Sequence, residues 1–362
     1  MSTPVPFALC AYSLPHTMGY LPTKSGEPIT EPLSLNAFVT KARELGLSGV
    51  EFPLLSRAPV FDGGFAETAS FSGDLRESLS NDNLTLIADY GALLDYDADH
   101  TTEYMKLAAG SGASVVRCIL SHILCGDRRN FPGGWQAHRN ALAQRLRELL
   151  PAAEDLGISL AIENHQDATS DDLLDLYEES GLSPAFGVTL DTGNPLSVCE
   201  DPVAYAQRIS SLIRHVHLKD YTVHFAPEGF RLVRCAAGDG VVDFPAILEI
   251  VRANGSRVMP AIEVAAQATR TVPMLEPDWW GCYPYEQMSR LPSALRTLWE
   301  KGRPAIEPYS SCWECGGSSA DVATEEWKLV VKSVKYFRTK DLGLRTEDHR
   351  PRSEERGTTS KY

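Results

Sequence analysis

Four acidic or imidazole side chains stand at the ends of short apolar runs in this 362-residue chain: Glu163, Asp191, His217 and Glu263. Three carboxylates gathered at one point repel one another and raise one another's pKa, so such a cluster needs a cation to balance it. An oxygen-rich set with one imidazole suits Mn²⁺ or Mg²⁺ best, with Co²⁺ or Zn²⁺ as further candidates. A fold that brings the four together would therefore hold one divalent metal ion.

The fold expected to bring them together is α/β, a closed (β/α)₈ TIM barrel. Short β-rich runs alternate with segments of helical periodicity, which is the pattern of repeated β–α units around a parallel sheet. The carboxyl ends of the strands form the active-site face of such a barrel, and all four side chains fall there. The expected strands are 7–13, 49–54, 84–91, 115–120, 159–166, 186–193, 213–220 and 257–265.

The helices between these strands have recognisable ends. Leucines recur on one face of the longest, and Gly157 follows it at the position of a left-handed cap. Asp243, followed by Phe244 and Pro245, is typical of an N-cap with an early-turn proline. A doubly wound open sheet is the competing architecture, but no G-x-G-x-x-G motif follows the first strand. The expected helices are 35–46, 73–82, 100–110, 136–156, 170–180, 201–211, 243–254 and 284–300.

The β–α alternation stops near residue 300, which predicts three regions. Residues 1–300 form the catalytic barrel. Residues 301–337 form a C-terminal helical extension, with an amphipathic helix near 325–337, packed on the barrel or on a neighbouring subunit of a homo-oligomer. Residues 338–362 are dense in charge and poor in apolar side chains, so we expect a loosely ordered tail.

Composition narrows the class of partner. The formal net charge of −14 disfavours nucleic acid, whose binding depends on clustered Lys and Arg. The sequence shows no signal segment and no run long enough to cross a membrane, which predicts a cytoplasmic protein without a membrane partner. Eight cysteines are scattered along the chain. Cys312 and Cys315 have ligand spacing, but no second pair matches them, so ordinary thiols are favoured over zinc.

Five motifs in order resemble the xylose-isomerase-like TIM-barrel superfamily of sugar isomerases and epimerases, which also includes the endonuclease IV group. They are AIENH (161–165), TLDTGN (189–194), HVHLKD (215–220), GDGVVDF (238–244) and AIEV (261–264). The resemblance implies that Glu163, Asp191, His217 and Glu263 hold one divalent metal and that the two glutamates also transfer protons. The DNA-repair branch needs more histidines and a basic face, which this chain lacks.

The resemblance and the positions of nearby residues suggest substrate contacts. Many sugar epimerases of this kind have a histidine three residues after the metal-binding aspartate, where this chain has Asn194. Lys219 can act as a base, but a salt bridge with the following Asp220 is favoured. Arg270 can bind a carboxylate or phosphate, or stay solvated. His215 shares a strand face with His217 and can ligate, support or pack. The candidate substrate contacts are Glu51, Asn164, His165, Asn194, Lys219 and Arg234, of which Arg234 is implied by the resemblance.

The expected reaction is metal-assisted proton transfer next to a ketone in a small carbohydrate or sugar acid. The ion would chelate the carbonyl oxygen and stabilise an enediolate, while Glu163 or Glu263 removes the α-proton. Return of the proton gives an epimer or an aldose–ketose isomer. A lyase uses the same electron sink, and decarboxylation of a β-keto sugar acid, as in 3-oxo-isoapionate decarboxylase, or inosose-type dehydration stays open. Asn194 favours that alternative, and a non-enzymatic sugar-binding subunit is a third. Isomerase or epimerase is preferred.

Overall fold

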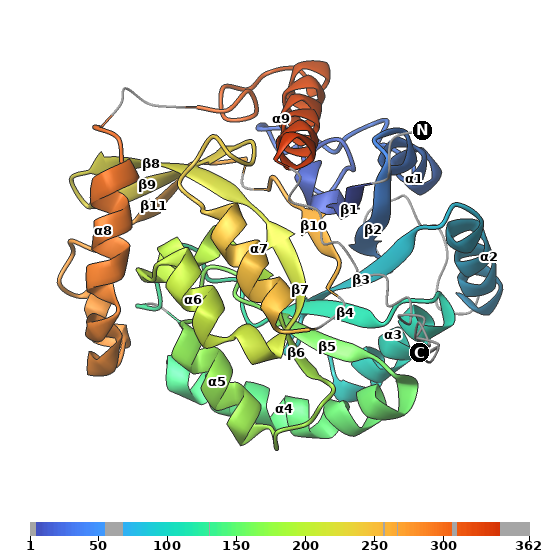
Figure 1. Cartoon of the computed structure of the whole chain (residues 1–362), viewed down its shortest axis with the longest axis horizontal. Helices are drawn as coiled ribbons and strands as arrows, with labels where there is room; N and C mark the ends of the chain where they lie inside the picture. Colours follow the sequence, from blue (N-terminus) through green and yellow to red (C-terminus); the bar gives the residue numbers. More distant parts are fainter. Residues whose placement is uncertain are drawn as a thin grey trace, which may run out of the picture.

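A closed barrel of parallel strands forms the centre of the protein. The computed structural model describes residues 5–54, 68–129, 131–255, 258–265, 267–305 and 310–340. Eight strands hydrogen-bond in the order β1-β10-β7-β6-β5-β4-β3-β2, with helices arranged around them (Figure 1). This confirms the predicted (β/α)₈ barrel. The barrel strands are β1 (Val5–Cys10), β2 (Leu47–Pro53), β3 (Thr85–Ala92), β4 (Val115–Ile119), β5 (Ser159–Glu163), β6 (Phe186–Asp191), β7 (Ile213–Leu218) and β10 (Pro260–Ile262).

The helices begin and end close to the predicted signals. Gly157 ends α4 with φ of +66°, and the side chain of Asp243 accepts a hydrogen bond from the backbone N–H of Ala246 at the start of α7. The described helices are α1 (Leu35–Glu44), α2 (Thr68–Asn81), α3 (Ala98–Gly110), α4 (Trp135–Leu156), α5 (Ser170–Glu179), α6 (Pro202–Arg208), α7 (Phe244–Ala253), α8 (Leu291–Lys301) and α9 (Ser319–Thr339).

Three predicted helices have clearly different bounds. Helix α2 begins at Thr68, five residues before the predicted start at 73. The helix expected over 284–300 is divided into a 3₁₀ turn, η6 (Tyr285–Ser289), and α8, because Pro292 lacks a backbone N–H and favours the first turn of a helix. Helix α9 begins six residues earlier than 325, where the Ser318 side chain accepts from the N–H of Asp321. Residues 341–362 of the expected tail lie outside the described residues. No helix in the described ranges combines enough length and apolar character to cross a bilayer.

The strands are buried on both faces, which explains their apolar composition. One face of each strand fills the barrel interior and the other packs against the surrounding helices. Every residue of β6 is buried, as are four of the five residues of β5. Polar side chains on these strands therefore have little access to water, and they need partners within the protein.

A small antiparallel sheet adjoins the barrel, and the sequence analysis did not predict it. Strand β8 (Asp220–Ala226) follows β7 almost directly, turns at residues 227–228 and returns as β9 (Gly229–Cys235), which also pairs with β11 (Arg270–Val272). Figure 1 shows this sheet beside the barrel, close to α8. The β–α rhythm hid it, because a hairpin inserted after a barrel strand does not interrupt the next helix, α7.

Helix α9 is fastened to the barrel by a buried carboxylate. Glu326 is fully buried and accepts hydrogen bonds from the backbone N–H groups of His16 and Thr17, both at 3.0 Å, and from the Thr17 hydroxyl at 2.5 Å. The side-chain amide of Gln267 donates to the same carboxylate. Because residues 16–17 follow β1 and residue 267 follows β10, this one side chain links the C-terminal helix to two loops at the carboxyl end of the barrel.

We expect Glu326→Ala to lower the free energy of unfolding by about 3 kcal/mol, because it leaves two buried backbone N–H groups without acceptors. Thermal and urea denaturation measure the change. Lys335→Ala, an exposed position on the same helix, serves as the control and should change stability by less than about 0.5 kcal/mol. Equal stability of the two variants would contradict the role assigned to Glu326.

Candidate metal centre

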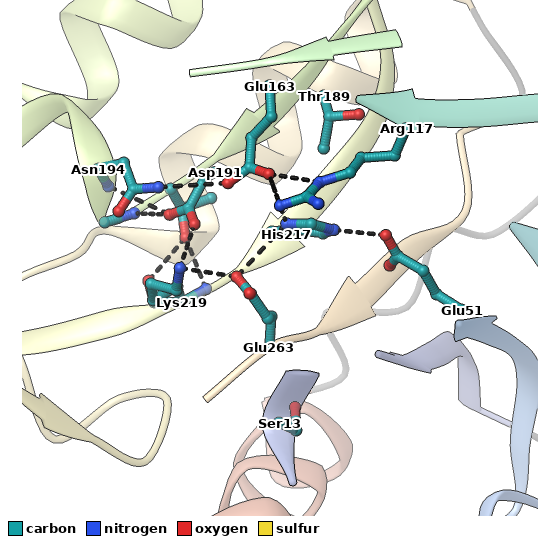
Figure 2. A network of polar contacts seen from close by, with 12 residues as sticks. Ser13, Glu51, Arg117, Glu163, Thr189, Asp191, Asn194, His217, Lys219 and Glu263 are labelled. Atoms are coloured by element: carbon teal, nitrogen blue, oxygen red, sulfur yellow. Dashed lines mark hydrogen bonds and ion pairs between the residues drawn. The ribbon is translucent and has the colours of Figure 1, made fainter. Parts of the chain in front are cut away.

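Four side chains converge at the carboxyl end of the barrel. Glu163 ends β5, Asp191 ends β6, His217 lies near the end of β7 and Glu263 follows β10 directly. One possible ligand atom from each lies within 4.8 Å of the others, and none of the four residues is more than 3% exposed. Figure 2 shows their polar groups facing one another. The structure therefore brings together the four residues expected to bind a metal.

The imidazole of His217 is oriented by Glu51. Its Nε2 lies 2.7 Å from Oε1 of Glu51, while Oε2 of the same carboxylate lies 2.9 Å from Nε2 of His215. Nδ1 of His217 has no hydrogen-bond partner and lies 3.8 Å from Glu163 Oε2 and 3.4 Å from Glu263 Oε2. A carboxylate that accepts the Nε2 proton leaves the Nδ1 lone pair directed at the cluster, as in carboxylate–histidine–metal triads. The residues thus fit a divalent cation.

Arg117 is a buried cation of the site that the sequence analysis missed. It lies on β4 and forms ion pairs with Glu163 and with Asp89, the latter at 3.1 Å between Nη1 and Oδ1. Burial raises the pKa of Glu163, but Arg117 together with His217 outweighs this effect and brings the pKa to about 2. Burial raises the pKa of Asp89 to about 8. The available signal was a charged residue inside the otherwise apolar run VVRCIL.

Lys219 also reaches into the cluster. Its Nζ lies 2.6 Å from Asp191 Oδ2 and 2.7 Å from Glu263 Oε2, so the salt bridge expected with Asp220 is wrong. Consecutive strand residues point to opposite sides, which separates the two side chains. Burial lowers the pKa of Lys219, but Asp191 and Glu263 reverse the effect and hold it well above its ordinary value. Asp220 instead accepts from the backbone N–H groups of Tyr221, Gly238, Gly240 and Val242.

The two asparagines have different surroundings. Asn164 joins β5 to β6, because its amide donates to the backbone oxygen of Asp191 and accepts from the N–H of that residue. Asn194 donates to Glu163 Oε1 at 3.3 Å, and its own oxygen has no partner. Asn194 therefore has a free acceptor beside the cluster, whereas Asn164 is occupied in holding the strand ends together.

The remaining expected contacts, His165, Glu51 and Arg234, differ in their surroundings. Burial lowers the pKa of His165 to about 4, and its Nδ1 has no partner. Both oxygens of Glu51 are engaged by imidazoles, so Glu51 orients the histidines and is not free for substrate. Arg234 lies on β9, and its Nη2 pairs with Glu325 of α9. Of the expected substrate contacts, Asn194 and Lys219 contact the carboxylates of the cluster directly.

Comparison with known proteins agrees with the barrel fold. The model of the xylose isomerase-like TIM barrel family matches residues 39–278. The chain belongs to this family. A solved L-ribulose 3-epimerase shares the fold with a TM-score of 0.51 and 16% identity, covering 90% of this chain and 97% of the epimerase. A xylose isomerase-like TIM barrel protein from Mycobacterium smegmatis, solved with magnesium, has a TM-score of 0.52 and 17% identity, covering 81% and 98%.

The similarity to curated relatives extends over less than half of this chain. The 3-oxo-isoapionate decarboxylase of Pectobacterium atrosepticum is 27% identical over 169 residues, which are 46% of this chain and 57% of that protein. This chain spans about half the length of the curated relatives it matches, between 42% and 57%. The comparisons therefore establish the family and the barrel fold. The reaction and the substrate have to be inferred from the site residues.

We expect Glu51→Gln to weaken Mn²⁺ binding by about 10–100-fold, because an amide offers one oxygen where two imidazole N–H groups need acceptors. Isothermal titration of the purified protein with Mn²⁺ measures the dissociation constant. Glu44→Gln, at an exposed position of α1, provides the control and should leave binding unchanged. An unaltered dissociation constant in Glu51→Gln would show that Glu51 does not orient the metal-binding histidine.

Proposed function

We propose that the protein is a divalent-metal-dependent isomerase or epimerase that acts on a keto-sugar or sugar acid. The convergence of Glu163, Asp191, His217 and Glu263 within 4.8 Å carries this proposal, since an oxygen-rich set with one imidazole suits Mn²⁺ or Mg²⁺. A divalent ion held by these residues supplies a Lewis acid that stabilises negative charge on a substrate carbonyl oxygen.

The arrangement of the two glutamates supports proton transfer. Strands β10, β7, β6 and β5 are consecutive in the barrel, so Glu263 and Glu163 bracket His217 and Asp191 from the two sides. A substrate carbon placed between them would have one carboxylate to remove its proton and a second group to return a proton elsewhere. Return to the opposite face gives an epimer, and return to the neighbouring carbon gives an isomer.

The surrounding residues have positioning roles in this proposal. Arg117 and Lys219 keep Glu163 and Glu263 ionised, which they must be to accept a proton. Asn194 presents an unpaired oxygen beside Glu163 and can accept a hydrogen bond from a substrate hydroxyl. His165 has an unpaired Nδ1 and can form a further contact.

We propose that the protein works in a reducing compartment and acts on a small molecule. All eight cysteines are free, four of them buried, which suits the cytoplasm. The net charge of −14 favours a small carbohydrate over nucleic acid as the partner.

We expect Glu263→Gln to lower kcat by about 10²–10⁴-fold, since an amide cannot remove a proton. Steady-state kinetics in the presence of saturating Mn²⁺ measure the loss, and titration with Mn²⁺ shows whether binding is retained. The exposed Glu286→Gln is the matched control and should keep full activity. Equal kcat values in the two variants would refute a proton-transfer role for Glu263.

A decarboxylase is the second candidate, and the ion pairs of the glutamates favour it. Arg117 and His217 together bring the pKa of Glu163 to about 2 against the effect of burial, which makes this carboxylate a weak base. Loss of CO₂ from a β-keto acid generates the same carbanion without removal of a C–H proton. The match to a 3-oxo-isoapionate decarboxylase of Pectobacterium atrosepticum points the same way.

NMR of keto-sugars and β-keto sugar acids incubated with the protein and Mn²⁺ in D₂O separates the two candidates. We expect deuterium to enter a carbon next to the carbonyl without loss of mass. Release of CO₂ from a keto acid would replace this proposal with the decarboxylase, and loss of water would replace it with a dehydratase. No change in any compound would contradict all three and favour a binding protein.

A further inference from the structure

Two arginines share one face of the small sheet formed by β8, β9 and β11. Arg234 is paired in register with Tyr221 across β8 and β9, and Arg270 is paired with Leu232 across β11 and β9. Cross-strand partners lie on the same face, as do alternate residues along a strand. Arg234 and Arg270 are therefore diagonal neighbours on the face of Tyr221, with Cα atoms about 7–8 Å apart.

This face lies against the loops that carry the metal-binding residues. The hydroxyl of Tyr221 accepts a hydrogen bond from the side-chain amide of Gln166 at 3.3 Å, three residues beyond Glu163. A Cβ added at Gly193, two residues beyond Asp191, would lie 2.8 Å from the Tyr221 ring. The arginine face of the sheet thus adjoins the loops after β5 and β6.

The guanidinium groups on this face are short of partners. Arg234 is only 4% exposed, and its Nε and Nη1 have no hydrogen-bond partner, although Nη2 pairs with Glu325. Arg270 is partly buried, its Nε is buried without a partner, and it forms no ion pair within the part of the chain that the structure describes. Buried donors of a charged group that lack acceptors are costly, so these atoms indicate a missing ligand.

Three acidic groups of neighbouring segments are engaged elsewhere. The two oxygens of Glu314 accept from the backbone N–H groups of Thr269 and Ser311, at 3.1 and 2.9 Å. Asp127 pairs with Arg129 at 2.8 Å. The oxygens of Glu326 accept from residues 16, 17 and 267. Among the described residues, a carboxylate offsets the charge of Arg234, whereas Arg270 has no carboxylate partner.

We propose that Arg234 and Arg270 bind the anionic group of the substrate, a carboxylate or a phosphate. An oxyanion placed between them would accept hydrogen bonds from Nε and Nη1 of Arg234 and from Nε of Arg270, and the planar guanidinium matches such groups in a bidentate manner. It would also relieve the repulsion between the two cations. This proposal rests on the proposed function and restricts its substrate to a sugar acid or a sugar phosphate.

Equilibrium binding tests this subsite without turnover. Full-length protein with Mg²⁺ is titrated calorimetrically with 2-keto-D-gluconate, D-fructose 6-phosphate and D-fructose. We expect one of the two anionic sugars to bind at least tenfold more tightly than D-fructose, and the identity of that sugar distinguishes carboxylate from phosphate. Arg270→Gln, at the edge of the sheet, should remove this preference with little change in the affinity for D-fructose.

Arg231→Gln provides the matched control. Arg231 lies on β9, is paired with Thr271 and so faces the other side of the same sheet. Its variant should keep the full preference, and thermal melting should show that all variants are folded. Equal affinities of the wild type for neutral and anionic sugars, or identical losses in the two variants, would overturn the anion subsite. Turnover of a keto-sugar by a protein that binds neutral and anionic sugars equally would overturn only this inference, whereas anion binding without turnover would overturn only the proposed reaction.

Discussion

The balance of buried charge at the carboxyl end of the barrel is the constraint on which the site depends. Glu163, Asp191 and Glu263 are removed from water within a few ångströms of one another, which is costly unless cations balance the charge or the carboxylates take up protons. Arg117 and Lys219 supply part of that compensation from β4 and from the end of β7. A divalent ion would supply the rest, and the same ion is what the proposed chemistry needs.

The side chains around the cluster fall into two groups: those that orient other residues and those with polar atoms free for a ligand. Glu51 lies on the far side of His217 from the cluster and fixes its ring, while Asn164 fastens the ends of β5 and β6 to each other. These side chains are fully occupied within the protein. Among the described residues, Nδ1 of His217, Nδ1 of His165 and the amide oxygen of Asn194 are buried without hydrogen-bond partners and are left for a ligand. Side chains whose polar atoms are paired within the protein hold the strand ends in place, and the unpaired polar atoms are the candidate ligand contacts.

The barrel and its four metal-binding candidates could be predicted because both depend on local patterns. Apolar runs that end in a polar residue report strand ends, and the order of strands in a parallel barrel follows the chain. Arg117 could not be found in this way, because its partners Glu163 and Asp89 are distant in sequence and only the closed barrel brings them together. The predicted salt bridge between Lys219 and Asp220 was wrong, because side chains of consecutive residues in extended backbone point to opposite sides. The hairpin β8–β9 was also missed, because its insertion after β7 interrupts no helix.

The anchoring of α9 by Glu326 has a consequence for how the protein folds during synthesis. This carboxylate joins residue 326 to residues 16 and 17, about 310 positions earlier in the chain. During synthesis the first strand and its loop leave the ribosome long before their partner exists. The loops after β1 and β10 can reach their final positions only once α9 has emerged, so completion of the site falls late in folding.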